Sequence, residues 1–167
     1  MSRDIKFRAW SIREQRMIHL ATSESSSTHL QLNNHTWGIF EPDLEDYCGG
    51  CTCNKLQDDI LMQYTGLNDK RDVEIYEGDI VKQTFNVYQG ETDYHDSYSL
   101  SGNDIGEVII LPSKGVCIKN IVRNAIENED EKIVNQKLKY YKNIVGYRCE
   151  VIGNIYENAS LLEGGAE

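Results

Sequence analysis

Short segments in which apolar and polar side chains alternate recur through the first 118 residues and constrain the fold of this chain more than any other feature. At the N-terminus, Ile5, Phe7 and Ala9 would face a core while the residues between them would face water. A period of two indicates β-strands with one buried face. The strands that we predict lie at residues 4–10, 17–20, 29–40 with a break at Asn33 and Asn34, 60–65, 74–76, 80–85, 105–111, 115–118 and 148–156. These strands predict a mainly β (α+β) fold built from small barrel-like sheets.

Residues 119–142 show a different period, from which we predict a helical insertion in the β fold. Two apolar series carry this prediction, namely Ile118, Val122 and Ile126, followed by Val134, Leu138 and Tyr141. Spacings of four and seven place apolar side chains on one face of an α-helix. Acidic residues at 127–131 precede the second series and lysines lie toward its end, which is the polarity that a helix macrodipole favours.

The length of 167 residues suits a single domain with its own core. We predict one domain over residues 1–167. Two intertwined parts are the alternative that the sequence leaves open, with an N-terminal β part at 1–58 and a C-terminal β part at 59–167 that contains the helical insertion. Hydrophobic residues make up 40% of the chain and charged residues 26%. This is an ordinary mix for a globular protein, so wholesale disorder is not expected.

No segment of the sequence combines the length and the hydrophobicity of a membrane span. The longest uninterrupted apolar run is Val108–Leu111, whereas crossing a bilayer takes about 20 apolar residues. The first six residues also lack the long apolar segment of a signal peptide. We therefore expect no membrane contact and a cytoplasmic location.

The charge balance is acidic and argues against general binding of nucleic acids. The chain has 17 Lys and Arg against 27 Asp and Glu, which gives a net charge of −10. An acidic chain repels phosphate backbones at long range. Only residues 1–23, with five basic and two acidic side chains, run against that trend. If nucleic acid binds anywhere, Lys6, Arg8 and Trp10 are the expected contacts, but a solvated strand face explains the basic residues better.

A cluster of three cysteines, Cys48, Cys51 and Cys53, is the sharpest candidate for chemistry. The Cys-x-x-Cys spacing lets two thiolates reach one tetrahedral Zn²⁺, with Cys53 as a third ligand and His35 or a nearby carboxylate as the fourth. A structural zinc site normally shows two separated pairs, and the sequence holds one. We therefore predict reduced thiols with no bound metal and no cofactor, and zinc binding stays the open alternative.

Catalytic signatures are absent from the sequence. His95 beside Asp96 would offer general acid–base chemistry, but both belong to a polar stretch at residues 88–103 that we predict to be a long exposed loop. Neighbouring residues in such a loop seldom hold catalytic geometry. The phosphate-binding loop, the nucleophile elbow, the zinc-protease motif and the dinucleotide fingerprint are all missing. We therefore predict that the chain is not an enzyme and has no catalytic residues.

Three segments together resemble a known family in their order and spacing. They are Ile5–Trp10, then Leu61–Lys70 with Glu74–Val81, and finally Cys149–Asn158. This arrangement is similar to the YopX family of phage and prophage proteins. The resemblance implies a mainly β fold and a phage or prophage origin, and hence the cytoplasm of a bacterial host. It transfers no catalytic, cofactor-binding or metal-binding residue to this chain.

Glycines and one turn within these segments carry structural predictions. Gly66 and Gly78 stand where turns need unusual backbone angles. Gly153, inside the last predicted strand, indicates a bulge or a close backbone approach. Val73 tolerates a positive φ poorly, so a turn longer than a tight type I′ hairpin is expected at residues 71–73. Each of these features serves the fold and predicts no chemistry.

Interaction with proteins is the function that the sequence favours. The chain has ten tyrosines, and tyrosine combines a large contact area with a polar tip that suits interfaces. We expect a broad apolar surface within the helical insertion, made by Ile133, Val134, Leu138, Tyr140 and Tyr141. The leading interpretation is a non-enzymatic phage or prophage protein that self-associates as a homo-oligomer or binds a host or phage protein. The alternative is a nucleic-acid-associated module, or an acidic mimic of DNA that inhibits a host DNA-binding protein.

Overall fold

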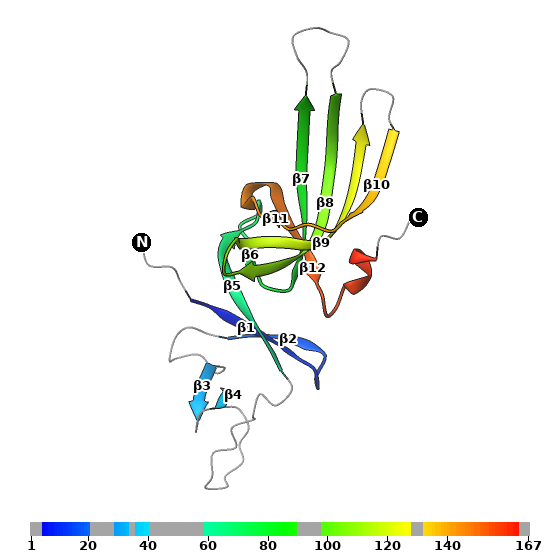
Figure 1. The fold of residues 1–167 in the computed structure, drawn as a ribbon. Helices are drawn as coiled ribbons and strands as arrows, with labels where there is room; N and C mark the ends of the chain where they lie inside the picture. Colours follow the sequence, from blue (N-terminus) through cyan, green and yellow to red (C-terminus); the bar gives the residue numbers. More distant parts are fainter. Residues whose placement is uncertain are drawn as a thin grey trace. The chain divides into compact units, whose positions relative to one another are not determined.

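The computed structural model describes residues 5–20, 29–33, 36–40, 59–89, 98–127 and 132–163. Strands dominate these residues, and the two helices among them are short 3-10 helices (Figure 1). The prediction of a mainly β protein is confirmed. The chain divides into two compact units, Met1–Tyr64 and Thr65–Glu167. The division falls inside a strand, a few residues beyond the boundary at residue 58 that the sequence suggested.

Unit 1, Met1–Tyr64, holds two small antiparallel arrangements. Its strands are β1 (Phe7–Ser11), β2 (Arg16–His19), β3 (His29–Asn33), β4 (Thr36–Phe40) and the first part of β5 (Ile60–Asn68). β1 pairs with β2 in a hairpin and with residues 60–63 of β5 on its other side. β3 and β4 form a separate hairpin. The predicted strand pair at the N-terminus and the predicted break within residues 29–40 are therefore confirmed.

The predicted orientation of the first strand is wrong. The alternation predicts that Arg8 faces water and Ile5 the core, yet Arg8 is 9% exposed and Ile5 is 71% exposed. β1 lies between β2 and β5, and the four residues from Arg8 to Ser11 are all buried. A strand that is covered on both faces has no solvent side. Alternation of residue types therefore does not separate core from surface in β1.

Unit 2, Thr65–Glu167, is built mainly on one curled antiparallel sheet, and its first complete strand, β6, lies outside that sheet and pairs with β5. Its elements are β6 (Glu74–Tyr76), β7 (Asp79–Gln89), β8 (Tyr98–Leu111), β9 (Gly115–Glu127), β10 (Lys132–Leu138), β11 (Lys142–Asn143), η1 (Gly146–Arg148), β12 (Cys149–Asn154) and η2 (Ala159–Leu162). The strand order is β10-β9-β8-β7-β12, with β11 also paired to β9. Figure 1 shows the upper parts of β7 to β10 side by side. From β7 to β10, sequence neighbours pair with each other, as hairpin connections allow.

The predicted helical insertion at residues 119–142 is wrong, because this stretch forms most of a β-hairpin. β9 and β10 pair antiparallel, with Ile126 opposite Ile133 and Ile121 opposite Leu138. A spacing of four also places residues on one face of a strand, so the members of each series that are four apart fit both periods. Ile and Val carry most of that series and favour strands because of their branched β-carbons. Pairing with a neighbouring strand, which no local pattern encodes, decides the outcome.

Both flanks of the exposed loop predicted at residues 88–103 are strands instead. β7 continues to Gln89 and β8 begins at Tyr98, and residues 90–97 lie outside the described part of the chain. The two strands pair residue by residue along this length. Backbone hydrogen bonds form such a ladder whatever the side chains are, so a polar stretch without a hydrophobic period can still extend a sheet.

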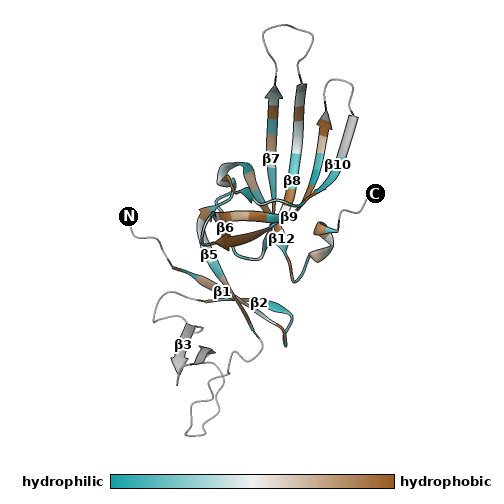
Figure 2. Cartoon of the chain, viewed as in Figure 1, coloured by the Kyte–Doolittle hydropathy of each residue, from teal (hydrophilic) through white to brown (hydrophobic). Residues whose placement is uncertain are grey.

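The core of unit 2 is contributed by β6 to β9 and β12. Its central residues are completely buried and comprise Ile75, Val81, Val108, Ile118, Ile121 and Cys149. Partly buried residues pack against them, namely Leu67, Val116, Leu138, Ile144 and Val151. Figure 2 shows strong hydrophobic colouring around β6 and β9, where much of this cluster lies. Each fully buried aliphatic side chain stabilises the fold by about 1.5–3 kcal/mol, so this cluster is the main apolar support of the unit.

Three glycines have the special backbone geometry that the sequence predicts, although Gly66 lies inside β5 and not in the predicted turn. Gly66 and Gly78 have φ of 79° and 80°, a region in which residues with a Cβ are strained. The pairing of β12 with β7 shifts register between Val151 and Gly153, which is the predicted bulge. A Cβ on Gly153 would lie 2.3 Å from the side-chain oxygen of Asn158, so the group that approaches this glycine closely is a side chain and not a second backbone segment.

The turn between β5 and β6 is organised by the buried carboxylate of Asp69. Its Oδ1 accepts hydrogen bonds from the backbone N–H groups of Arg71 at 2.7 Å and Val73 at 3.0 Å, and its Oδ2 accepts one from Val151 at 3.0 Å. Asp72, rather than Val73, takes a positive φ of 65°. Asp69 therefore closes a turn that is longer than a tight type I′ hairpin, as predicted, and ties it to β12.

We expect Asp69 to make the stability of unit 2 depend on pH under acidic conditions. Burial raises the pKa of this carboxyl, but the three amide donors and Arg71 outweigh burial, so its pKa lies below the ordinary value of 3.8. A group whose pKa falls on folding stabilises the fold above its unfolded pKa and loses that contribution as pH falls through the folded pKa. We expect Asp69→Asn to lower the free energy of unfolding by about 1–3 kcal/mol at neutral pH. In urea titrations, the free energy of unfolding of this variant should also fall less steeply below about pH 4 than that of the wild-type chain.

Asp72→Asn is the matched control for this prediction. Asp72 lies in the same turn, is exposed, and has a left-handed backbone, which Asn tolerates. We expect this variant to follow the wild-type chain at every pH. The same acid dependence in Asp69→Asn and in the wild-type chain would contradict the role assigned to Asp69.

Candidate interaction surface

Most residues that the sequence singles out for chemistry lie outside the described part of the chain. They are His35, Cys48, Cys51, Cys53, His95 and Asp96. The interpretation of the cysteines as reduced thiols and the zinc alternative therefore stay predictions. Among the described residues, no group of His, Cys, Asp and Glu side chains is arranged to hold a metal ion.

The basic strand at the N-terminus is engaged within unit 1. Trp10 is buried, so its ring cannot stack on a base. Arg8 is buried as well. The ammonium of Lys6 lies 5.3 Å from the centre of the Tyr64 ring, which is a cation–π contact. All three of these residues therefore take part in the packing of unit 1.

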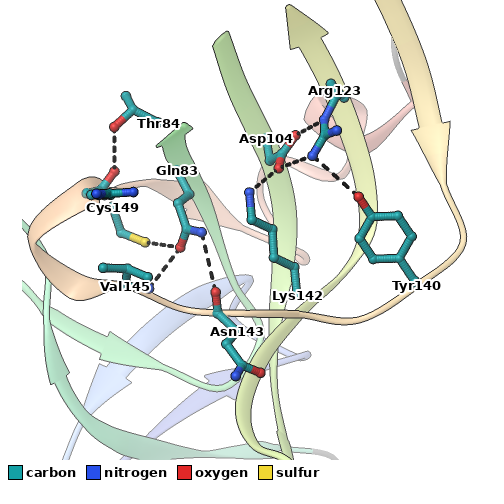
Figure 3. A network of polar contacts seen from close by, with 10 residues as sticks. Gln83, Thr84, Asp104, Arg123, Tyr140, Lys142, Asn143, Val145 and Cys149 are labelled. Atoms are coloured by element: carbon teal, nitrogen blue, oxygen red, sulfur yellow. Dashed lines mark hydrogen bonds and ion pairs between the residues drawn. The ribbon is translucent and has the colours of Figure 1, made fainter. Parts of the chain in front are cut away.

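A buried ion network crosses the middle of the unit 2 sheet (Figure 3). Its centre is Asp104 on β8, whose side chain is completely buried. Arg123 on β9 donates from Nε to Oδ1 at 2.7 Å and from Nη2 to Oδ2 at 2.9 Å, and Lys142 on β11 donates to Oδ2 at 2.5 Å. Gln83, Asp104 and Arg123 lie opposite one another on β7, β8 and β9. Strand register is therefore what brings these groups together.

The two cations of this network share the Phe85 ring and connect it to a surface tyrosine. The guanidinium of Arg123 lies 4.4 Å and the ammonium of Lys142 4.9 Å from the ring centre. Figure 3 shows Arg123 between Asp104 and Tyr140, and its Nη2 donates to the Tyr140 hydroxyl at 3.4 Å. Burial raises the pKa of Asp104, but its two cationic partners outweigh burial and hold the pKa below the ordinary value. The carboxylate is therefore ionised and positions the groups around it.

A second polar cluster anchors the segment after β11. The Oε1 of Gln83 accepts hydrogen bonds from the Val145 N–H at 2.9 Å and the Cys149 thiol at 3.1 Å, and its Nε2 donates to the Asn143 carbonyl at 3.3 Å. Burial raises the pKa of Cys149 to about 11. The thiol therefore stays protonated at neutral pH and lacks the reactivity of a thiolate. Together with the ion network, this cluster holds residues 140–149 against the sheet.

A groove of about 530 Å³ lies beside β10, at the start of this anchored segment. Its lining comes from β9, β10, the residues that follow β10, and η2. The apolar part of the lining consists of Ile121, Leu138 and Leu162. Exposed side chains of Lys137, Lys139, Tyr140 and Tyr141 line it as well. The groove therefore combines an apolar base with cationic and aromatic groups.

The lining of the groove is positively charged, although the chain as a whole carries a net charge of −10. The ammonium of Lys119 lies 3.1 Å from a carboxylate oxygen of Glu107, which offsets its charge. Within the described residues, Lys137 and Lys139 have no ion-pair partner. Glu163 is the acidic residue of the lining. Two of the three lysines of the lining therefore form no ion pair with a carboxylate of the described residues.

Two tyrosines line the groove. Tyr140 and Tyr141 are 50% and 47% exposed. The Tyr140 hydroxyl accepts the hydrogen bond from Arg123, and the ring of Tyr141 lies 5.1 Å from the ammonium of Lys114. Both side chains are thus positioned by a cation before any partner binds.

The apolar surface predicted around these tyrosines is confirmed only in part. Tyr140 and Tyr141 are exposed as expected. Leu138, predicted as part of the same surface, packs against the core cluster instead, because the strand geometry of β10 turns it toward the sheet's interior. The side chains of Ile133 and Val134 lie outside the described part. Replacing Leu138 would therefore perturb folding and would not isolate an interface.

Nearly the whole sequence matches one known family. The family model described as YopX protein matches residues 6–163. This chain belongs to the YopX family. The resemblance carried by the three sequence segments is thereby confirmed.

One solved structure similar to this YopX-family chain is the crystal structure of protein EF1440 from Enterococcus faecalis. The two are 24% identical, the alignment covers 96% of this chain and 99% of that chain, and the TM-score is 0.43. No curated protein matches this chain. In the part of this YopX-family chain that the structure describes, no helix has the length and hydrophobicity to cross a membrane.

The sequence of this YopX-family chain singles out Tyr140 and Tyr141 but carries no signal for the residues that position them. Asp104 lies 19 residues before Arg123 and 38 residues before Lys142. Acidic and basic residues at such separations occur in any chain with this many charges. Only the register of an antiparallel sheet makes them neighbours, so spacing in the sequence could not reveal the network.

Proposed function

We propose that this chain is a non-enzymatic interaction protein of phage or prophage origin, which binds a host or phage protein or further copies of itself. The observation that carries the proposal is the groove beside β10, where an apolar base adjoins two half-exposed tyrosines. Protein interfaces are enriched in tyrosine and contain an apolar centre with a polar rim. The groove offers the same combination.

The contacts that hold the two tyrosine side chains in place support this role. Arg123 holds the Tyr140 hydroxyl, and Lys114 lies over the Tyr141 ring. Binding usually loses free energy because interface side chains must be immobilised. Side chains that are already held lose less, so the rings are suited to act as anchors for a partner.

Three buried ionisable groups of the described part support a non-enzymatic role. Asp104 is occupied by two cations, and Asp69 by three backbone amides. The Cys149 thiol is protonated and donates to Gln83. A general base or nucleophile must present a reactive atom to its substrate. These three groups instead direct their atoms into structural contacts.

The nucleic-acid alternative receives less support from the described residues. Its expected contacts are Lys6, Arg8 and Trp10, and these take part in the packing of unit 1. The net charge of −10 adds long-range repulsion from phosphates. Mimicry of DNA is supported by the net charge alone, which is a property of many soluble proteins. Binding of a protein is therefore the function that we propose.

Replacing both tyrosines of the groove by serine should weaken partner binding without loss of the fold. Truncation of an anchor residue often lowers the free energy of binding by at least about 1–2 kcal/mol. We therefore expect the Tyr140→Ser, Tyr141→Ser double variant to retain a host or phage partner at least about tenfold less well than the wild-type chain. Affinity capture from phage-infected host cells measures partner binding, and sedimentation equilibrium measures any self-association. Circular dichroism should be unchanged.

Tyr147→Ser is the matched control, because Tyr147 on η1 is 73% exposed and does not line the groove. This variant should bind as the wild-type chain does. Equal binding by the double variant and the control would contradict the proposal. A wild-type chain that is monomeric and captures no protein, or that retains duplex DNA at physiological salt, would contradict it as well.

A further inference from the structure

We propose that the groove beside β10 binds an acidic segment of a different protein, which lies extended along β10 and places an apolar side chain in the groove. This inference rests on the proposed function and specifies the chemistry of the partner. Three features carry it, namely the uncompensated lysines, the apolar base and the outer edge of β10.

Charge complementarity selects an acidic partner. Lys137 and Lys139 line the groove and have no ion-pair partner within the described residues. Lys137 belongs to β10 and Lys139 directly follows its last residue, and both side chains line the groove. Carboxylates at alternate positions of an extended partner segment match this arrangement. Ion pairs formed there would weaken as salt is raised, because exposed charges are screened.

The apolar base selects a peptide over a simple anion. Leu138 and Leu162 are partly exposed and contribute apolar surface to the lining, and the buried side chain of Ile121 lies behind them. The volume of about 530 Å³ falls within the range of roughly 300–1,000 Å³ that ligand pockets occupy. Phosphate would leave this apolar surface unused. A segment that carries both carboxylates and an aliphatic side chain uses both parts of the groove.

The edge of the sheet offers backbone groups to such a segment. β10 is the last strand in the order β10-β9-β8-β7-β12 and pairs with β9 along one side. No other described strand pairs with its second side, and Figure 1 shows β10 at the margin of the sheet. An extended peptide can add to an open edge as a further strand. The groove lies at the C-terminal end of β10, where the partner's apolar side chain would enter.

The same lysines argue against a second copy that pairs through this edge. Two β10 strands related by a two-fold axis would bring their lysine-bearing edges together, and like charges would repel. Lysine on an edge strand is a common means by which proteins prevent edge-to-edge association. An acidic partner is attracted by the same lysines. The charge of this edge therefore favours an acidic segment of another protein over a second copy of this chain.

Fluorescence anisotropy with short labelled peptides tests the inference on the full-length chain. The first probe alternates Glu with Leu, and its counterparts replace Glu by Gln, Glu by Lys, or Leu by Ser. We expect the Glu–Leu peptide to bind with a dissociation constant in the micromolar range and each counterpart to bind at least about tenfold more weakly. The Lys137→Glu, Lys139→Glu double variant should bind the Glu–Leu peptide at least about tenfold more weakly than the wild-type chain.

The matched control is the Arg13→Glu, Lys70→Glu double variant, which has the same change in net charge. Both of its residues are exposed and lie outside the groove lining. It should bind the Glu–Leu peptide as the wild-type chain does. Equal binding of all peptides, no binding of the Glu–Leu peptide, or equal losses in the two double variants would overturn the inference.

Two further outcomes identify a different occupant and overturn the inference in the same way. One is self-association of the wild-type chain that Lys137→Glu with Lys139→Glu abolishes, which would assign the groove to a second copy. The other is displacement of the peptide by a short DNA duplex at physiological salt. If the acidic peptide fails to bind while the serine variant of both tyrosines still loses its partner, the proposed function stands and only this inference fails.

Discussion

Asp104→Ala is expected to lower the free energy of unfolding by about 3–5 kcal/mol, because it removes a buried carboxylate that pairs with two partly buried cations. Asp104 is completely buried and accepts three hydrogen bonds from Arg123 and Lys142. Without the carboxylate, the two cations would remain together at the Phe85 ring. Repulsion between them and the loss of their acceptor both destabilise the fold. Urea denaturation followed by circular dichroism measures the effect.

Glu150→Ala is the control that separates a buried network from an exposed one. Glu150 on β12 also contacts two cations, with Lys70 at 2.7 Å and Arg71 at 3.2 Å. These cations are about half exposed, and exposed ion pairs contribute little to stability. We expect Glu150→Ala to unfold at the same urea concentration as the wild-type chain. A loss in Asp104→Ala no larger than the loss in Glu150→Ala would show that the buried network does not stabilise unit 2.

Gly102→Val is expected to destabilise the chain by about 2–4 kcal/mol through a backbone clash. A Cβ at this position would lie 2.2 Å from the carbonyl oxygen of Asn124 and 2.6 Å from the Cα of Ala125. Both atoms belong to the backbone of the paired strand β9, so relief requires the two strands to move apart. Gly102 lies opposite Ala125 in the register of β8 and β9. The missing side chain is therefore what allows the close approach of these strands.

Ser101→Val tests whether the clash, and not the added bulk, is responsible. Ser101 is the preceding residue of β8 and is exposed, and valine favours strands more than serine does. This variant should melt at or above the wild-type temperature. If Gly102→Val and Ser101→Val have the same melting temperature, the close approach at Gly102 places no constraint on the sheet.

The sequence by itself determined the fold class, the positions of many strands and several special backbone sites. β1, β2, β6 and β12 occupy predicted segments within a few residues, because alternation and turn residues are properties of short stretches. Gly78 and Gly153 were predictable for the same reason, since a missing Cβ has meaning at a single position. The three motif segments also indicated the YopX family, which the match over residues 6–163 confirms.

The tertiary structure decided the conformation of residues 119–142. Apolar residues four positions apart lie on one face of a helix and also on one face of a strand. β8 settles the choice, since it pairs with β9 along most of its length and β10 then pairs with β9. A local pattern carries no information about which strand lies beside it. The orientation of Arg8 escaped prediction for a related reason, because burial of both faces of β1 depends on what packs on it.

The tertiary structure also decided the residues around the candidate surface. Tyr140 was recognisable by residue type, but its position depends on Arg123, which depends in turn on Asp104. Buried charges are tolerated only where they are paired and hydrogen-bonded. That pairing is set by the register of β8 and β9 and by the path of β11. Residues far apart in the sequence become one network only when the sheet forms, because the strand pairing creates the distances on which their electrostatic attraction depends.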